Sequence, residues 1–158
     1  MVELHRGSLF ENPAQALVNP VNTVGVMGKG LALQFRERFP EMFADYARAC
    51  AAGELEVGRV HVFDRGADHT RARWIIHFPT KRHWREPSRM ADVEAGLLAL
   101  VAAVTELKIK SVAVPALGCG LGGLRWSDAR PLIEAAFANL ADVKVLLYGP
   151  AGPASTKR

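Results

Sequence analysis

Short apolar runs alternate with segments of helical periodicity along the chain, and this alternation predicts strands separated by helices. The runs that we assign to strands are residues 2–9, 16–19, 57–63, 73–78, 111–115 and 143–148. Several of these runs are almost continuously apolar, which is typical of strands that are buried on both faces. The pattern therefore predicts an α/β fold whose central sheet is covered by helices on both sides.

Four segments carry apolar residues at helical spacing. Residues 30–38 place Leu31, Phe35 and Phe39 on one face, and a second helix around residues 42–50 ends at Gly53. A long helix is expected to start at a Ser88 cap and to bury a stripe formed by Val93, Leu97, Leu100, Val101 and Val104. The fourth helix, residues 127–139, has Ser127 or Asp128 as its expected N-cap and Pro131 in its first turn.

Two glycine-rich loops each follow an apolar run and lead into a helix. The first contains Gly25, Gly28 and Gly30, and the second has four glycines within residues 118–123. Glycine permits positive φ and close approach of the backbone, and a helix N-terminus attracts anions. Because the arrangement occurs twice, we expect a ligand with two or more phosphates held between the loops. The spacing fits neither a P-loop nor a dinucleotide-binding fingerprint, which argues against ATP hydrolysis and hydride transfer.

Composition narrows the class of protein further. The chain has 158 residues, a formal net charge of +4 and 49% hydrophobic residues, as expected for one folded domain with an acidic ligand or partner. No apolar run approaches the length of a membrane span and the N-terminus lacks a signal sequence, so we expect a cytoplasmic monomer. Two cysteines and five scattered histidines show no metal-ligand spacing, and we predict no metal and no disulfide. Residues 149–158 are interpreted as a tail or linker.

Several of these motifs resemble those of the macrodomain family, which binds ADP-ribose. The resemblance rests on Gly7-Ser8-Leu9-Phe10, on residues 19–22 and on the loop at residues 118–123. It covers residues 1–148 and implies a three-layer α/β/α sandwich around a mixed, mostly parallel sheet. It also implies an ADP-ribose site formed by Ser8, Leu9, Asn22, Val26, Met27, Gly28, Lys29, Gly30, Leu31, Pro115, Leu117, Gly118, Cys119, Gly120, Leu121 and Gly122. Ser8 stands where many members have an adenine-binding aspartate, so adenine recognition would rely on the backbone of Leu9.

Within the family, residues 26–32 and 118–121 resemble the terminal ADP-ribose glycohydrolases. Residues 19–23 and 80–85 resemble a narrower branch that removes ADP-ribose from thymine bases of single-stranded DNA. This branch acts as the antitoxin to a DNA ADP-ribosyltransferase toxin. The resemblance therefore implies a hydrolase without a cofactor, with ADP-ribose, modified single-stranded DNA and the cognate toxin as partners. Gly122 departs from the protein-directed members, which carry an aspartate there, so any step that this acid assists needs another group.

Lys81 and Asn22 are the candidate catalytic residues. Lys81 follows a predicted strand at the edge where α/β folds bind ligands, and its amine could attack the anomeric carbon or protonate the departing base. Attack requires loss of a proton, which burial and the nearby Arg82 and Arg85 would favour by lowering the pKa. A solvated surface lysine is the alternative. Asn22 is expected to orient the distal ribose, although a structural Asx turn would use the same residue.

Residues 81–85, Lys81, Arg82, His83, Trp84 and Arg85, combine cations with an aromatic ring and are the predicted DNA contact. A solvated loop with a structural tryptophan is the alternative. Two other functions compete with DNA deribosylation. One is hydrolysis of ADP-ribosylated protein carboxylates or of acetylated ADP-ribose, and the other is a non-catalytic ADP-ribose-binding module. Lys81 favours an enzyme, and residues 81–85 favour nucleic acid over protein.

Overall fold

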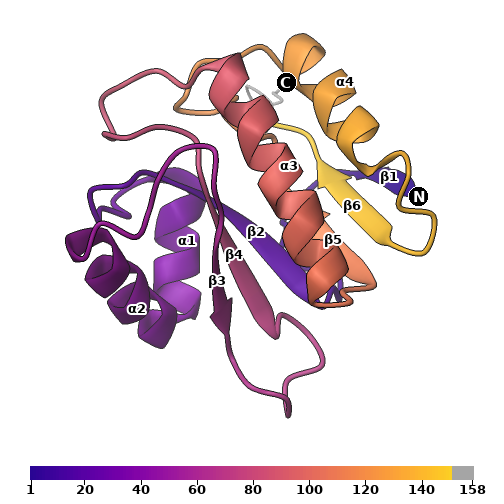
Figure 1. Cartoon of the computed structure of the whole chain (residues 1–158), viewed down its shortest axis with the longest axis horizontal. Helices are drawn as coiled ribbons and strands as arrows, with labels where there is room; N and C mark the ends of the chain where they lie inside the picture. The colour runs from indigo at the N-terminus through magenta and orange to yellow at the C-terminus, as the bar shows by residue number, and fades with distance from the viewer. Residues whose placement is uncertain (151–158) are drawn as a thin grey trace.

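The computed structural model describes residues 1–150 and is built around one six-stranded sheet (Figure 1). The strand order is β1-β6-β5-β2-β4-β3; every neighbouring pair is parallel except β3 and β4, which are antiparallel. The strands are β1 (Val2–His5), β2 (Ala16–Val21), β3 (His61–Asp64), β4 (Trp74–Pro79), β5 (Ser111–Val114) and β6 (Lys144–Tyr148). The helices are α1 (Gly30–Arg38), α2 (Pro40–Ala51), α3 (Met90–Glu106) and α4 (Trp126–Phe137).

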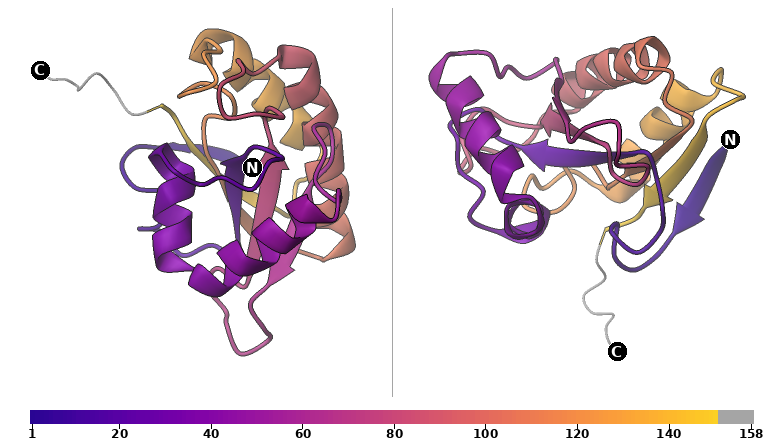
Figure 2. Two further views of the ribbon diagram at one scale, coloured as in Figure 1. Left: turned by 90° about the vertical axis from the view of Figure 1, so that its left-hand side faces the viewer. Right: turned by 90° about the horizontal axis from the view of Figure 1, so that it is seen from below.

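Helices lie on both sides of the sheet (Figure 2). Alternate residues along each central strand face opposite layers of these helices. Val18 and Ile76 pack toward α3 and α4, whereas Leu17 and Ile75 pack toward α1 and α2. All four side chains are at most 3% exposed. The predicted three-layer α/β/α fold with a mixed, mostly parallel sheet is therefore confirmed.

The parallel strands β2, β4 and β5 end at the same edge of the sheet. The segment after β2 leads into α1, the segment after β4 into α3 and the segment after β5 into α4. The two predicted glycine loops and Lys81 lie in these three segments, so the topology brings them to one edge of the molecule.

Three predicted strand boundaries were wrong by two residues or more, and glycine explains two of them. The first strand ends at His5 and not at residue 9, because Gly7 adopts a φ of +91° and turns the chain away from the sheet. The third strand starts at His61 and not at residue 57, since Gly58 adopts a φ of +85°. The second strand continues through Pro20 to Val21, two residues beyond the prediction.

Both predicted helix caps were also wrong. α3 begins at Met90 after Arg89, and α4 begins at Trp126 after Arg125, in each case without a side-chain cap. Ser88, Ser127 and Asp128 therefore do not cap these helices. Pro131 lies inside α4 and not in its first turn. Of the predicted tail, only residues 149 and 150 belong to the described part of the chain.

Candidate active site

Three segments meet at the carboxyl edge of the sheet: the first loop (residues 22–29), the basic segment (residues 81–85) and the second loop (residues 115–124). The amide of Thr23 in the first loop donates to the carbonyl of Arg82 over 2.9 Å. The amide of Ser88, just after the basic segment, donates to the carbonyl of Gly122 over 2.9 Å. A Cβ at Gly30 would lie 3.6 Å from Leu121, so the end of the first loop also touches the second. The three segments form a continuous rim.

Asn22 holds the first loop in shape. Its Nδ2 donates to the carbonyl of Val26 over 2.8 Å, and its Oδ1 accepts the amide of Val24 over 3.1 Å. The hydroxyl of Tyr46 on α2 lies 2.9 Å from the same Oδ1. Burial raises the pKa of Tyr46 well above its usual value, so its hydroxyl stays protonated and available as a donor. The Asx-type structural role is thus present, while the ribose-orienting role of Asn22 stays a prediction.

The remaining residues of the first loop divide between core and rim. Met27 is 1% exposed and its sulfur lies 3.9 Å from Nδ2 of Asn19, so its side chain packs beneath the loop. Val26, Gly28, Lys29 and Gly30 are exposed, and Leu31 is half-buried. Gly25 and Gly30 adopt positive φ values of 89° and 61°, whereas Gly28 does not. The loop therefore presents its backbone and Lys29 to solvent.

The second loop needs glycine for different reasons at different positions. Gly118 and Gly123 adopt φ values of +77° and +81°. A Cβ at Gly122 would lie 2.2 Å from Oγ of Ser88 and 2.5 Å from the carbonyl oxygen of Gly118, so the site has no room for a side chain. Gly120 has neither restriction, because its φ is not positive and nothing lies within 4 Å of its Cβ position. Only at Gly120 does the fold itself give no reason for glycine.

The other predicted residues of this loop have mixed exposure. Pro115 and Leu117 are buried, Cys119 is half-buried and Leu121 is 69% exposed. The thiol of Cys119 lies 3.7 Å from the carbonyl oxygen of Leu117, and burial raises its pKa. Cys119 is thus a protonated, partly packed residue.

Ser88, which the sequence predicted to be a helix cap, lies instead beside the second loop. It is 5% exposed, and its hydroxyl has no hydrogen-bond partner within residues 1–150. It fills the space beside Gly122, the position where the protein-directed relatives were expected to carry an acid. No carboxylate occurs in residues 115–124, so the second loop supplies no acid–base group.

Lys81 lies half-buried at the exit of β4. Its Nζ donates to the carbonyl of Trp84 over 3.0 Å, which folds the side chain back along the basic segment. Burial lowers the pKa of Lys81 from its usual value. The predicted contribution of Arg82 and Arg85 to this shift is not found, and desolvation alone accounts for it. The lowered pKa increases the fraction of neutral amine at a given pH.

The basic segment presents an aromatic ring to solvent. Trp84 is 43% exposed, the guanidinium of Arg85 lies 4.6 Å from its ring centroid, and the His83 ring lies 5.0 Å away on centroids. The backbone amide of Arg85 donates to Nδ1 of His83 over 3.1 Å. Arg82 and Arg85 are exposed. The solvent-facing ring flanked by cations is compatible with base stacking and phosphate attraction.

Ser8 and Leu9 lie in the turn after β1. Oγ of Ser8 accepts the amide of Phe10 over 3.2 Å, and the Ser8 amide donates to the carboxylate of Glu11 over 3.2 Å. The side chain of Leu9 is 4% exposed and belongs to the core beneath α1 and α2. Of this pair, the backbone of Leu9 remains the group expected to recognise adenine.

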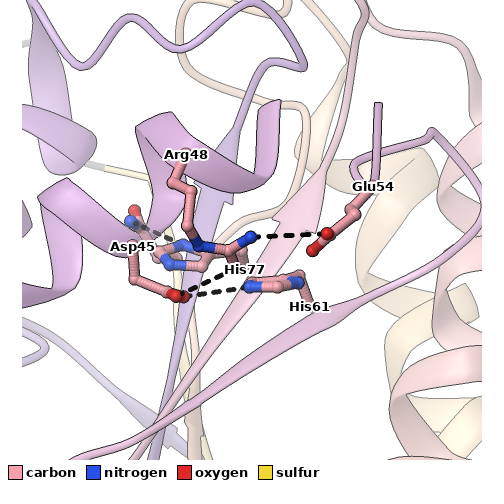
Figure 3. Close-up of polar contacts among 6 residues, drawn as sticks. Asp45, Arg48, Glu54, His61 and His77 are labelled. Atoms are coloured by element: carbon pink, nitrogen blue, oxygen red, sulfur yellow. Dashed lines mark hydrogen bonds and ion pairs between the residues drawn. The ribbon is translucent and has the colours of Figure 1, made fainter. Parts of the chain in front are cut away.

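A polar cluster lies between α2 and the strands β3 and β4 (Figure 3). Nε2 of His61 lies 3.1 Å from Asp45 on α2, and the His61 ring stacks on that of His77 with centroids 6.0 Å apart. Burial and the neighbouring His61 lower the pKa of His77 to about 3. Burial raises the pKa of Asp45, but hydrogen bonds from His61 and Arg48 outweigh that effect and leave it lowered. The cluster links α2 to β3 and β4.

Tyr46, Ser88 and His77 are structural residues of the site that sequence reasoning missed. Tyr46 and His77 could have been found from the sequence, because each is a polar side chain inside an apolar stripe and needs a hydrogen-bond partner there. No such signal marks Ser88. Within residues 1–150, no cluster of three or more histidine, cysteine or acidic side chains could hold a metal ion. In the same part of the chain, no helix is long and apolar enough to cross a membrane.

Comparison with known proteins gives a consistent result. The sequence profile of the macro domain matches residues 18–133. The chain is 49% identical over 150 residues to a protein of Thermus aquaticus named DNA ADP-ribosyl glycohydrolase. That match covers 95% of this chain but 41% of the relative, so the chain spans less than half the length of this protein.

Two solved structures are similar to this chain. The macrodomain of Mycobacterium tuberculosis DarG superposes with a TM-score of 0.91 at 48% identity, covering 95% of this chain and 98% of that one. Thermosipho africanus DarTG, solved in complex with ADP-ribose, superposes with a TM-score of 0.85 at 37% identity. This second match covers 98% of the present chain and 43% of that one.

Proposed function

The chain belongs to the macro domain family, and from this premise we propose that it is an ADP-ribosyl glycohydrolase that removes ADP-ribose from thymine bases of single-stranded DNA. The observation that carries the proposal is that the segment carrying Lys81 meets two glycine loops at one edge of the sheet. The loops supply an anion-binding backbone, and the lysine supplies a reactive group beside it. The name of the Thermus aquaticus relative supports the same activity.

In this proposal the second loop binds the diphosphate of ADP-ribose. Its exposed position Gly120 lets backbone N–H groups approach the phosphates without a side chain in between. The first loop, held by Asn22 and Tyr46, takes the distal ribose beside Lys29. The turn at Ser8 and Leu9 takes the adenine. Thermosipho africanus DarTG, which was solved with ADP-ribose, supports a ligand of this type.

Lys81 acts on the bond between ADP-ribose and the base. As a neutral amine it would form a bond to the anomeric carbon while the glycosidic bond breaks, with the proton passing to the base and water then releasing ADP-ribose. As an ammonium it would instead donate its proton to the departing base while water attacks. The lowered pKa of Lys81 increases the fraction of neutral amine, which is compatible with the first route.

The basic segment gives the enzyme its preference for DNA. Trp84 offers an exposed face for a base next to the modified thymine, and Arg82 and Arg85 attract the flanking phosphates. The partners that follow are ADP-ribose, ADP-ribosylated single-stranded DNA and the cognate toxin DarT, whose modification the protein would reverse. We place the activity in the cytoplasm, where the chromosome of a bacterium lies.

A direct comparison of substrates tests this function. The purified protein is incubated with a single-stranded oligonucleotide carrying one ADP-ribosylated thymine, and separately with a protein ADP-ribosylated on carboxylates. Release of ADP-ribose is followed by chromatography. Rapid release from DNA is expected. Release from the protein substrate alone would favour the carboxylate-directed hydrolase, and tight binding of ADP-ribose without release from either substrate would identify a non-catalytic module.

A further inference from the structure

A second hollow lies at the amino edge of the sheet, opposite the candidate active site. It is a cleft of about 270 Å³ between the C-terminal end of α1, the loop before β2 and the loop before β4. Phe10 and Phe39 form its aromatic part, and Arg38 and Arg71 form its charged part. The two loops are joined by a hydrogen bond from the amide of Ala72 to the carbonyl of Ala14 over 2.7 Å. This bond holds together the two loops that line the cleft.

Arginines around this cleft are stacked on phenylalanine rings. The guanidinium of Arg38 lies 4.3 Å from the centroid of Phe10, and that of Arg65 lies 4.7 Å from the centroid of Phe39. Arg65 also donates to the carbonyl of Ala72 over 3.0 Å, which fixes its position. Its buried Nε has no partner within residues 1–150. Stacking holds the flat face of the exposed Arg38 guanidinium and leaves its N–H edge available to an anion, whereas Arg65 uses its N–H edge to hold the loop before β4.

These arginines are among the eight of thirteen in residues 1–150 that form no ion pair with a carboxylate. Within residues 1–150, no carboxylate lies within ion-pair distance of Arg36, Arg38, Arg65 or Arg71. By contrast, Arg48, Arg59, Arg73, Arg125 and Arg130 each contact an acidic side chain. Uncompensated guanidinium groups gathered beside aromatic rings favour a polyanion with flat groups, and a single nucleic acid strand has both features.

The distance from the active site suits such a strand. α1 starts in the first loop at Gly30 and ends at the cleft with Arg38, so its nine residues span about 13 Å. At the rise of about 3.4 Å per nucleotide along one strand of DNA, this corresponds to roughly four nucleotides. Lys29 is exposed at the start of this path and can neutralise a phosphate there.

We infer that α1 and the arginine cleft form a second contact for the DNA strand, several nucleotides away from the modified base. This inference rests on the proposed function and extends it. The basic segment binds the nucleotides next to the scissile bond, and the cleft binds phosphates farther along the strand. The cleft thereby makes the enzyme prefer long strands over short ones and over free ADP-ribose.

Oligonucleotide length separates the two contacts experimentally. The Arg38→Ala/Arg71→Ala double variant is compared with wild type on a 3-mer and a 15-mer that carry the modified thymine at the centre. We expect KM for the 15-mer to rise at least fivefold with kcat unchanged, and the 3-mer to be processed as by wild type. The logarithmic salt slope for the 15-mer should become shallower by about 1.4, at about 0.7 for each lost phosphate contact.

The Arg125→Ala/Arg130→Ala variant is the matched control, because it removes two positive charges, one from α4 and one from the residue just before it. Equal changes in KM for both double variants, or none for the cleft variant, would overturn the inference. The Arg38→Gln/Arg71→Gln variant keeps more of the side-chain bulk if the alanine variant proves unstable. Should wild type fail to release ADP-ribose from DNA, the proposed function fails, and fluorescence anisotropy with an unmodified 15-mer still tests the cleft by the same comparison of variants.

Discussion

Replacing Gly120 by glutamate should weaken ADP-ribose binding while leaving the protein folded. The backbone at Gly120 does not need positive φ, and the space around its Cβ position is open, so a side chain there meets no steric obstacle in the fold. If the diphosphate lies against this loop, the new carboxylate faces two negative phosphates. At about 5 Å, each charge pair costs about 0.8 kcal/mol in water and about 3.3 kcal/mol at an effective dielectric constant of 20. The affinity should therefore fall by roughly 4- to 270-fold for each phosphate charge.

The measurement is calorimetric titration with ADP-ribose, combined with urea denaturation of the same samples. Gly120→Ala is the control without charge and should keep both stability and most of the affinity. Gly122→Ala is the opposite control, because its Cβ would overlap Ser88 and the backbone of Gly118. Overpacking of this kind costs about 1–3 kcal/mol of unfolding free energy. A folded Gly120→Glu protein with wild-type affinity would refute the placement of the diphosphate in the second loop.

Three further predictions address the DNA contact and the titrating groups. Trp84→Ala/Arg85→Ala should raise KM for modified DNA by the equivalent of about 1–3 kcal/mol, with calorimetry showing unchanged affinity for free ADP-ribose. His77 has a pKa of about 3 in the fold against 6.5 for the free side chain, so the unfolded chain binds the extra proton between these values. The free energy of unfolding measured by urea denaturation should therefore fall as pH decreases from 6.5 toward 3, by up to about 1.4 kcal/mol per pH unit, and His77→Gln should remove that part of the slope. The pH profile of kcat should show the titration of Lys81 at a pH below the usual lysine pKa of 10.5. The value of kcat should rise with pH if the neutral amine attacks, and fall with pH if the ammonium donates the proton. A profile without such a transition would contradict both roles.

The alternation of apolar runs and helical stripes was sufficient to predict the layers of this fold. Strands such as β2 and β4 are buried on both faces, and their nearly continuous runs of apolar residues predict this burial from the sequence. Boundaries were harder to predict because they depend on single backbone angles. Gly7 and Gly58 end or delay strands through positive φ, and nothing in the neighbouring sequence distinguishes them from glycines inside a loop.

The site was predictable at the level of segments and less so at the level of side chains. The glycine loops and Lys81 were located correctly at the carboxyl edge because parallel strands must end there. The position of Ser88 depends on how two segments more than thirty residues apart in sequence meet, through its hydrogen bond to Gly122. Helix-capping preference is local and favoured the wrong role for this residue. The same limit applies to Asn22, whose amide oxygen in the first loop accepts the hydroxyl of Tyr46 on α2.

Release of ADP-ribose by a Lys81→Ala variant is the most direct test of the central claim. The variant and wild type are mixed with thymine-ADP-ribosylated single-stranded DNA under single-turnover conditions, and ADP-ribose binding is measured in parallel by calorimetry. A group that acts mainly in the transition state should be required for release but not for binding. We therefore predict loss of release with retained affinity, and no rescue by Lys81→Arg, because a guanidinium stays protonated. Release at the wild-type rate by the folded Lys81→Ala protein would contradict the account.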